Sequence, residues 1–121
     1  MTDKLLVLDD EPDFASFVRQ VAESAGLEVT VITDPADFKD VYRQFAPQRI
    51  VLDVVMPGMD GIEIMKWLGS VGNTANVILV SGYSPHYVEA AKLMAGAESS
   101  FSVRTLTKPL SASELSLALT S

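Results

Sequence analysis

The chain has 121 residues, enough for one domain with its own hydrophobic core, and we expect residues 1–121 to form a single domain. Hydrophobic residues make up 48% of the sequence, which argues against disorder, and the absence of cysteine excludes disulfides and thiolate metal sites. The formal net charge of −7 opposes direct binding to nucleic acid or to anionic lipid.

Short apolar runs alternate with longer amphipathic segments along the chain, which is the pattern of repeated strand–helix units. Right-handed crossovers between such units give an α/β fold, a doubly wound five-stranded parallel sheet with helices on both faces. The predicted strands lie near residues 4–8, 28–32, 49–54, 76–80 and 101–106. The predicted helices lie near residues 12–25, 35–46, 61–71, 85–97 and 111–120.

Local signals place several element boundaries. Asp34 and Pro35 combine a helix cap with a proline at the first helical position. Gly26 and Gly72 follow predicted helices where a left-handed residue ends the helix. The run at 101–106 alternates apolar and polar residues, so we expect it at an edge of the sheet.

Polar side chains come directly after four of the apolar runs. The first run leads into Asp9 and Asp10, and the third ends on Asp53. The fourth ends on Ser81, and the fifth leads to Lys108. Because parallel strands bring their carboxyl ends to one edge of a sheet, where open α/β folds keep their sites, these groups should lie together. Three carboxylates, a hydroxyl and a lysine suit a divalent cation and a phosphoryl group.

Asp9, Asp10 and Asp53 are the chemical centre of this predicted site. Two carboxylates about 4 Å apart repel each other by roughly 4 kcal/mol at an effective dielectric constant near 20, so the cluster needs a cation or a proton. Ligands that are all oxygen favour Mg²⁺, and an aspartate can itself form an acyl phosphate. The alternatives are a helix cap for Asp9 or Asp10, a turn for Ser81 and a solvated surface position for Lys108.

Four motifs stand at the ends of the predicted strands in a fixed order. They are Leu-Asp-Asp-Glu-Pro at 8–12, Leu-Asp-Val-Val-Met-Pro-Gly-Met-Asp-Gly at 52–61, Ser-Gly at 81–82 and Lys-Pro at 108–109. Over essentially the whole chain they resemble the response-regulator receiver domain, and the segment 52–61 is the most specific. The resemblance implies a flavodoxin-like (βα)5 fold with strand order 2-1-3-4-5. It also implies a phosphoacceptor switch of two-component signalling that assists its own phosphoryl transfer and dephosphorylation and is not an enzyme.

The resemblance implies a role for most residues of the predicted site. Asp53 matches the aspartate that accepts a phosphoryl group from a phosphohistidine in a Mg²⁺-dependent reaction. Asp10 and Asp53 match the direct metal ligands, with the main-chain carbonyl of Val55, and Asp9 matches the acid that holds the metal through water. Lys108 matches the lysine that pairs first with the carboxylate and then with the phosphate.

The switch residues match the family less completely. Ser81 matches the hydroxyl that bonds a phosphoryl oxygen after phosphorylation. The family usually has Tyr or Phe three residues before the lysine, where this chain has Thr105, and Tyr83 is the candidate replacement as a local aromatic reporter. Val55 cannot orient a water and Tyr83 is bulky, so we expect slow hydrolysis of the acyl phosphate. The partner-binding surface is expected around the fourth helix, fifth strand and fifth helix.

The resemblance also implies partners. A sensor histidine kinase or a histidine phosphotransfer protein would donate the phosphoryl group, and an effector domain or separate output protein would receive the signal. We expect a monomer or a phosphorylation-dependent dimer. No secretory signal or membrane-length apolar run is visible in the sequence, so we expect a cytoplasmic protein without membrane or direct nucleic-acid contact.

Other functions fit the sequence less well. A receiver-like scaffold that is never phosphorylated would not need the intact set of acids. A Mg²⁺-dependent aspartyl-phosphate phosphatase of the haloacid-dehalogenase kind needs a general acid two residues after its nucleophile, where this chain has Val55. A flavin or nucleotide module needs a glycine-rich phosphate loop after the first strand, and none follows.

Overall fold

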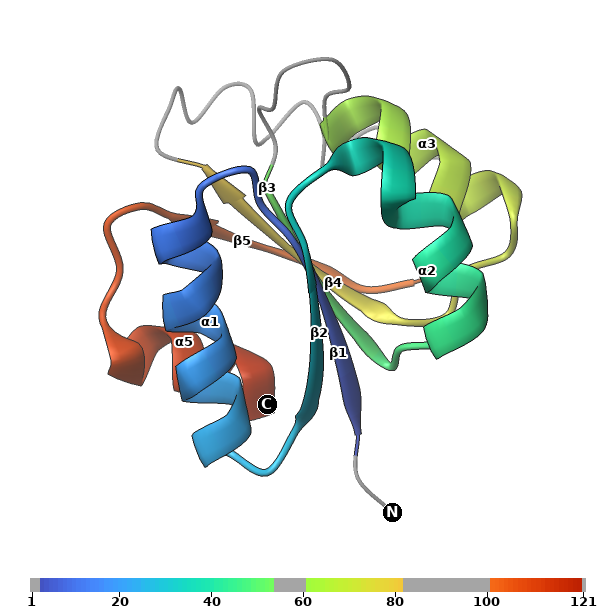
Figure 1. Cartoon of the computed structure of the whole chain (residues 1–121). Coiled ribbons are helices and arrows are strands. Elements are labelled where there is room, and N and C mark those ends of the chain that lie inside the picture. Colours follow the sequence, from blue (N-terminus) through green and yellow to red (C-terminus); the bar gives the residue numbers. More distant parts are fainter. Residues whose placement is uncertain (1–2, 54–60, 82–100, 121) are drawn as a thin grey trace.

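The central element of the fold is one five-stranded parallel sheet (Figure 1). The computed structural model describes residues 3–53, 61–81 and 101–120. The strands are β1 (Lys4–Leu8), β2 (Glu28–Ile32), β3 (Arg49–Asp53), β4 (Asn76–Ser81) and β5 (Val103–Thr107). Their order, β2-β1-β3-β4-β5, confirms the predicted doubly wound α/β fold and its strand order.

Helices cover both faces of this sheet, with α1 and α5 on one face and α2 and α3 on the other (Figure 1). Among the described residues, no helix combines the length and the apolar character needed to cross a bilayer. The helix predicted at 85–97 lies outside the described residues. The described helices are α1 (Pro12–Ser24), α2 (Phe38–Phe45), α3 (Gly61–Ser70) and α5 (Ala112–Thr120).

The segment predicted as one helix over 35–46 consists of two parts. Pro35–Asp37 is a 3₁₀ turn, and Asp34 caps it by accepting a hydrogen bond from the backbone N–H of Ala36 at 2.9 Å. The α-helix proper begins at Phe38, whose side chain is fully buried, and ends at Phe45. Ala46 follows as its C-cap in the left-handed conformation with φ 52°. Asp34 is therefore confirmed as a cap. It caps a short 3₁₀ turn, which precedes the α-helix that begins at the buried Phe38.

The boundary signals after α1 and α3 are confirmed, whereas β5 starts later than predicted. Gly26 and Gly72 have φ values of 89° and 73°, which glycine adopts without a steric penalty. Phe101 is buried in the core ahead of the strand, and β5 runs from Val103 to Thr107. The apolar character of Phe101 thus serves packing and not strand pairing. β5 lies at an edge of the sheet, as predicted.

The alternation of side chains along each strand divides the core into two layers. Both layers are almost fully buried. This packing holds the ends of the strands, which the polar site residues follow, in fixed positions. The layer under α1 and α5 contains Leu5, Val7, Ala15, Val18, Ala22, Val29, Val51, Ile78, Val80, Leu115, Ala118 and Leu119. The layer under α2 and α3 contains Leu6, Leu8, Ile32, Phe38, Ile50, Leu52, Ile64, Met65, Leu68, Ala75, Val77, Leu79 and Phe101.

A buried polar link connects α2 to the turn before β4. The hydroxyl of Tyr42 donates a hydrogen bond to Asn73 Oδ1 at 2.8 Å, and Asn73 is 2% exposed. The Asn73 amide exchanges two further hydrogen bonds, each 3.0 Å long, with the backbone of Ala75. Burial raises the pKa of the Tyr42 hydroxyl. The link fixes α2 against the turn that leads into the central sheet.

Tyr42→Phe is expected to lower the free energy of unfolding by about 0.5–1.5 kcal/mol, because it leaves one lone pair of the buried Asn73 oxygen without its donor. Urea denaturation followed by circular dichroism measures this change. Ser16→Ala, which removes an exposed hydroxyl on α1, serves as the control and should change stability by less than about 0.5 kcal/mol. Equal stability of Tyr42→Phe and the wild type would show that the link is not stabilising.

Candidate functional site

The ends of β1 and β3 bring three carboxylates together. These strands are neighbours in the sheet, and Leu8 lies opposite Leu52, so the residues that follow each of them are adjacent. Asp9, Asp10 and Asp53 each place a carboxylate oxygen within 4.8 Å of the others. The strand register therefore produces the acid cluster that was predicted from the sequence.

The cluster is largely removed from solvent. Asp9 is 0% exposed and Asp53 is 3% exposed, while Asp10 is half-buried. Asp9 Oδ1 accepts a hydrogen bond from the backbone N–H of Glu11 at 2.8 Å. Burial raises the pKa of Asp9, although the Glu11 N–H and the ammonium of Lys108 both act to lower it. The folded protein thus holds the Asp9 carboxyl where water solvates its charged form poorly.

Lys108 brings the only ammonium group that contacts this cluster among the described residues. It follows the end of β5, and its Nζ lies 3.1 Å from Asp9 Oδ2, 2.7 Å from Glu11 Oε1 and 3.7 Å from Asp53 Oδ2. Burial alone would lower the pKa of Lys108. The close pairing of its ammonium with the carboxylates of Glu11 and Asp9, together with the charge of Asp53, outweighs this effect and raises it. The lysine is therefore held as a cation beside Asp53.

The other predicted site residues are described only in part. The backbone of Ser81 ends β4 opposite Thr107, on the same edge of the sheet, but its side chain lies outside the description. Val55 and Tyr83 lie outside the described residues altogether. Thr105, where the resemblance led us to expect an aromatic residue, is half-buried in β5 opposite Leu79.

Two residues at the site were not predicted to contact it. The carboxylate of Glu11 pairs with Lys108, and the ring of Phe14 lies under the same ammonium, with its centroid 4.3 Å from Nζ. Glu11 belongs to the motif at 8–12, so its position beside Asp10 was a usable signal. Phe14 lies within the helix predicted at 12–25, and nothing in the sequence indicates its cation–π contact.

The donor set of the cluster fits a hard divalent cation. All three carboxylates offer oxygen, and Asp9 Oδ2, although buried, has no hydrogen-bond partner among the described residues; Lys108 meets it only as an ion pair. Three clustered carboxylates carry more negative charge than the ammonium of Lys108 offsets, so a further cation would stabilise them. The buried acid cluster is thus suited to a metal ion with oxygen ligands.

Mg²⁺ is expected to raise the midpoint of thermal unfolding, because a bound dication offsets the mutual repulsion of the carboxylates. The carboxylates of Asp10 and Asp53, within 4.8 Å, each repel Asp9 by about 3.5 kcal/mol or more at an effective dielectric constant near 20, and Glu11 adds to this repulsion. The ammonium of Lys108 at 3.1 Å attracts Asp9 by about 5 kcal/mol, so repulsion prevails. Asp9→Asn should therefore stabilise the protein in EDTA by roughly 1–3 kcal/mol and weaken its response to Mg²⁺. Thermal and urea unfolding with and without Mg²⁺ measure both effects.

Asp13→Asn is the matched control for that experiment, since Asp13 is exposed in the first turn of α1 and the variant changes the net charge equally. It should leave the response to Mg²⁺ intact. If Asp9→Asn destabilised the protein in EDTA and kept the full response to Mg²⁺, the repulsive cluster inferred from the geometry would be wrong.

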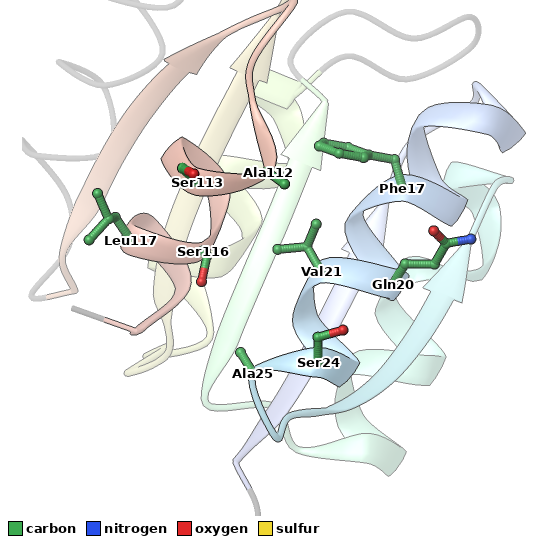
Figure 2. A pocket seen from close by; sticks show the side chains of 9 residues that line it. All are labelled: Phe17, Gln20, Val21, Ser24, Ala25, Ala112, Ser113, Ser116 and Leu117. Atoms are coloured by element: carbon green, nitrogen blue, oxygen red, sulfur yellow. The ribbon is translucent and has the colours of Figure 1, made fainter.

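A groove of about 680 Å³ lies elsewhere, between α1 and α5 (Figure 2). Figure 2 shows Phe17 and Val21 facing across it toward the fifth helix, and Leu117 on its outer side is 69% exposed. None of the described residues that line it has an acidic, basic or histidine side chain, so it is not where the chemistry of the acid cluster takes place. Its lining residues are Phe17, Gln20, Val21, Ser24, Ala25, Ala112, Ser113, Ser116 and Leu117.

Comparisons with known proteins agree on one family. The sequence profile of the response regulator receiver domain matches residues 5–120. The chain is 34% identical over 98 residues to the "Virulence factors putative positive transcription regulator BvgA" of Bordetella pertussis, covering 80% of this chain and 47% of that protein. It is 33% identical over 108 residues to the "Protein-glutamate methylesterase/protein-glutamine glutaminase 5" of Myxococcus xanthus, covering 88% of this chain and 30% of that protein.

Solved structures agree with these sequence matches. The receiver domain of a Francisella response regulator superimposes with a TM-score of 0.83 at 28% identity, covering 98% of this chain and 93% of that one. The curated relatives are longer, and the chain spans about half the length of BvgA and about a third of the methylesterase. The similarity therefore concerns the receiver part of these relatives.

Proposed function

This chain belongs to the response regulator receiver domain family, and we propose that it is a phosphoacceptor switch in which Asp53 takes up the phosphoryl group. One observation carries the assignment of the residues. The carboxylate oxygens of Asp9, Asp10 and Asp53 lie within 4.8 Å of one another, and Lys108 Nζ lies 3.7 Å from Asp53 Oδ2. A nucleophilic carboxylate, a candidate metal site and a fixed cation thus meet at one point.

The arrangement supports phosphoryl transfer by position and charge. A carboxylate oxygen of Asp53 attacks phosphorus, and the bond from phosphorus to the imidazole nitrogen of a phosphohistidine breaks as the imidazole leaves. Phosphoryl transfer depends mainly on positioning and on compensating charge on the phosphoryl oxygens. Lys108 is held as a cation at the distance where it can meet those oxygens. Burial keeps Asp53 close to its partners and away from bulk water.

The metal ligands belong to the same proposal. Asp10 and Asp53 would bind Mg²⁺ directly with the main-chain carbonyl of Val55, and Asp9 would hold it through water. When bound, Mg²⁺ neutralises charge on the transferring group. The convergence of three carboxylates beside the ammonium of Lys108 supports a further cation here. The hydroxyl of Ser81, at the end of β4, would bond a phosphoryl oxygen only after transfer, which is the differential contact a switch requires.

We further propose that the phosphoryl donor is a sensor histidine kinase or a histidine phosphotransfer protein. The signal would pass to an effector domain or a separate output protein. Residues 1–121 would form one receiver domain that is not itself an enzyme, in the cytoplasm, as a monomer or as a dimer on phosphorylation. The family supports this proposal, as does the presence of a transcription regulator among the relatives.

Incubation with acetyl phosphate, with and without Mg²⁺, followed by intact mass measurement tests the proposed function. We expect one phosphoryl adduct per chain that requires Mg²⁺. Consumption of acetyl phosphate without an adduct would favour the phosphatase alternative. If neither an adduct nor consumption occurred, the chain would be an unphosphorylated scaffold, and the proposal would fail.

A further inference from the structure

The first turn of α1 makes two contacts with Lys108 that the proposed transfer reaction does not require. Glu11 is the N-cap residue of α1, with an extended backbone at φ −96° and ψ 106°, yet its carboxylate makes no capping hydrogen bond. Its Oε1 instead lies 2.7 Å from Lys108 Nζ. Phe14, three residues on, places its ring 4.3 Å from the same nitrogen. The start of the helix thus holds the lysine from two sides.

The distances around Lys108 are unequal. Glu11 Oε1 is the nearest acidic oxygen at 2.7 Å, Asp9 Oδ2 follows at 3.1 Å, and Asp53 Oδ2 is the farthest at 3.7 Å. Glu11 also fixes Asp9 through its backbone N–H, which donates to Asp9 Oδ1 at 2.8 Å. The ammonium is therefore placed closer to Glu11 and Asp9 than to the acceptor. The side chain of Lys108 is 14% exposed, so its ammonium has little room to occupy a different position.

We infer that Glu11 is a positioning residue that restrains Lys108 in the unphosphorylated state and thereby slows phosphoryl transfer to Asp53. The inference rests on the proposed function. In the reaction with acetyl phosphate, an Asp53 oxygen forms a bond to phosphorus, and the bond from phosphorus to acetate breaks as acetate leaves with the electron pair. Lys108 must meet the phosphoryl oxygens during this step, so Glu11 competes with them for the same ammonium. The negative charge of Glu11 also opposes the approach of the anionic donor.

The exposure of Glu11 determines how much its removal should change the rate of phosphoryl transfer. Its side chain is 63% exposed, so water screens the pair strongly, and such ion pairs contribute little individually. Glu11→Gln keeps the shape and removes the charge. We expect adduct formation from acetyl phosphate at saturating Mg²⁺ to become about two- to fivefold faster. Intact mass as a function of time measures this rate.

Asp13→Asn is the matched control for this rate comparison. Asp13 lies in the same first turn of α1, is exposed, and has no ion-pair partner among the described residues. The variant changes the net charge and the charge near the helix start equally, so it reproduces any general effect on an anionic donor. We expect its rate to equal that of the wild type. A rate increase of the same size in Asp13→Asn would overturn the specific role of Glu11.

A second readout needs neither metal nor phosphoryl transfer. Urea unfolding in EDTA of the wild type, Glu11→Gln, Lys108→Met and the double variant forms a thermodynamic cycle. We expect the cost of losing Glu11 to disappear when Lys108 is already Met. Additive effects, or an unchanged or slower transfer rate in Glu11→Gln, would overturn the inference while the wild type still forms its adduct. If the wild type formed no adduct at all, the proposed function would fail as well.

Discussion

Asp53→Ala is expected to form no detectable phosphoryl adduct under conditions that label the wild type, a loss of at least about 1000-fold in the rate. The variant removes the carboxylate that attacks phosphorus. Asp53 is also one of the three acids of the buried cluster, so the variant should weaken Mg²⁺ binding at the same time. Intact mass after incubation with acetyl phosphate and Mg²⁺ measures the adduct, and circular dichroism verifies that the variant is folded.

Asp13→Ala is the control for this loss, because it removes an exposed aspartate that does not belong to the cluster. It should be labelled at the wild-type rate. Labelling of Asp53→Ala to the wild-type extent would show that another side chain accepts the phosphoryl group.

Lys108→Met is expected to slow adduct formation by about 100-fold, the loss typical when one preorganised charge partner of a transition state is removed. The variant keeps most of the side-chain volume but removes the ammonium that lies 3.7 Å from Asp53 Oδ2. Asp9 and Asp53 then lose the ammonium of Lys108, so the variant should also be less stable in EDTA and should regain stability with Mg²⁺. Time-resolved intact mass and thermal unfolding measure the two effects.

Lys66→Met is a matched control, because Lys66 is exposed on α3 and lies outside the site. Its rate of adduct formation should equal that of the wild type. If Lys108→Met were labelled as fast as Lys66→Met, the charge of Lys108 would not contribute to transfer, and the pairing with Asp53 would be structural only.

The fold and the acid cluster could be predicted because each depends on a short-range pattern. Apolar runs of strand length alternate with amphipathic segments, and this pattern leads to one parallel sheet. Asp9 directly follows one such run and Asp53 ends another. The register of β1 and β3 is therefore enough to place the two carboxylates side by side. Lys108 could be placed at the same point because it follows β5, which lies next to β4 in the sheet.

Other features could not be predicted because they depend on packing between distant segments. The contact of Glu11 with Lys108 joins residues 97 positions apart. The motif at 8–12 places Glu11 near the site, but nothing in the sequence identifies Lys108 as its partner. The Tyr42–Asn73 link likewise joins α2 to a turn 31 residues away. The late start of β5 arises because Phe101 is used in the core, which an apolar run alone does not distinguish from strand pairing.

Reduction of the phosphorylated protein with borohydride, followed by peptide sequencing, tests the central claim most directly, because borohydride converts an aspartyl phosphate to homoserine. We predict homoserine at position 53 and at no other acid, and only in samples that received both Mg²⁺ and acetyl phosphate. Homoserine at position 9, 10 or 13 in place of 53, or a stable adduct that resists borohydride, would contradict the assignment of Asp53 as the phosphoacceptor.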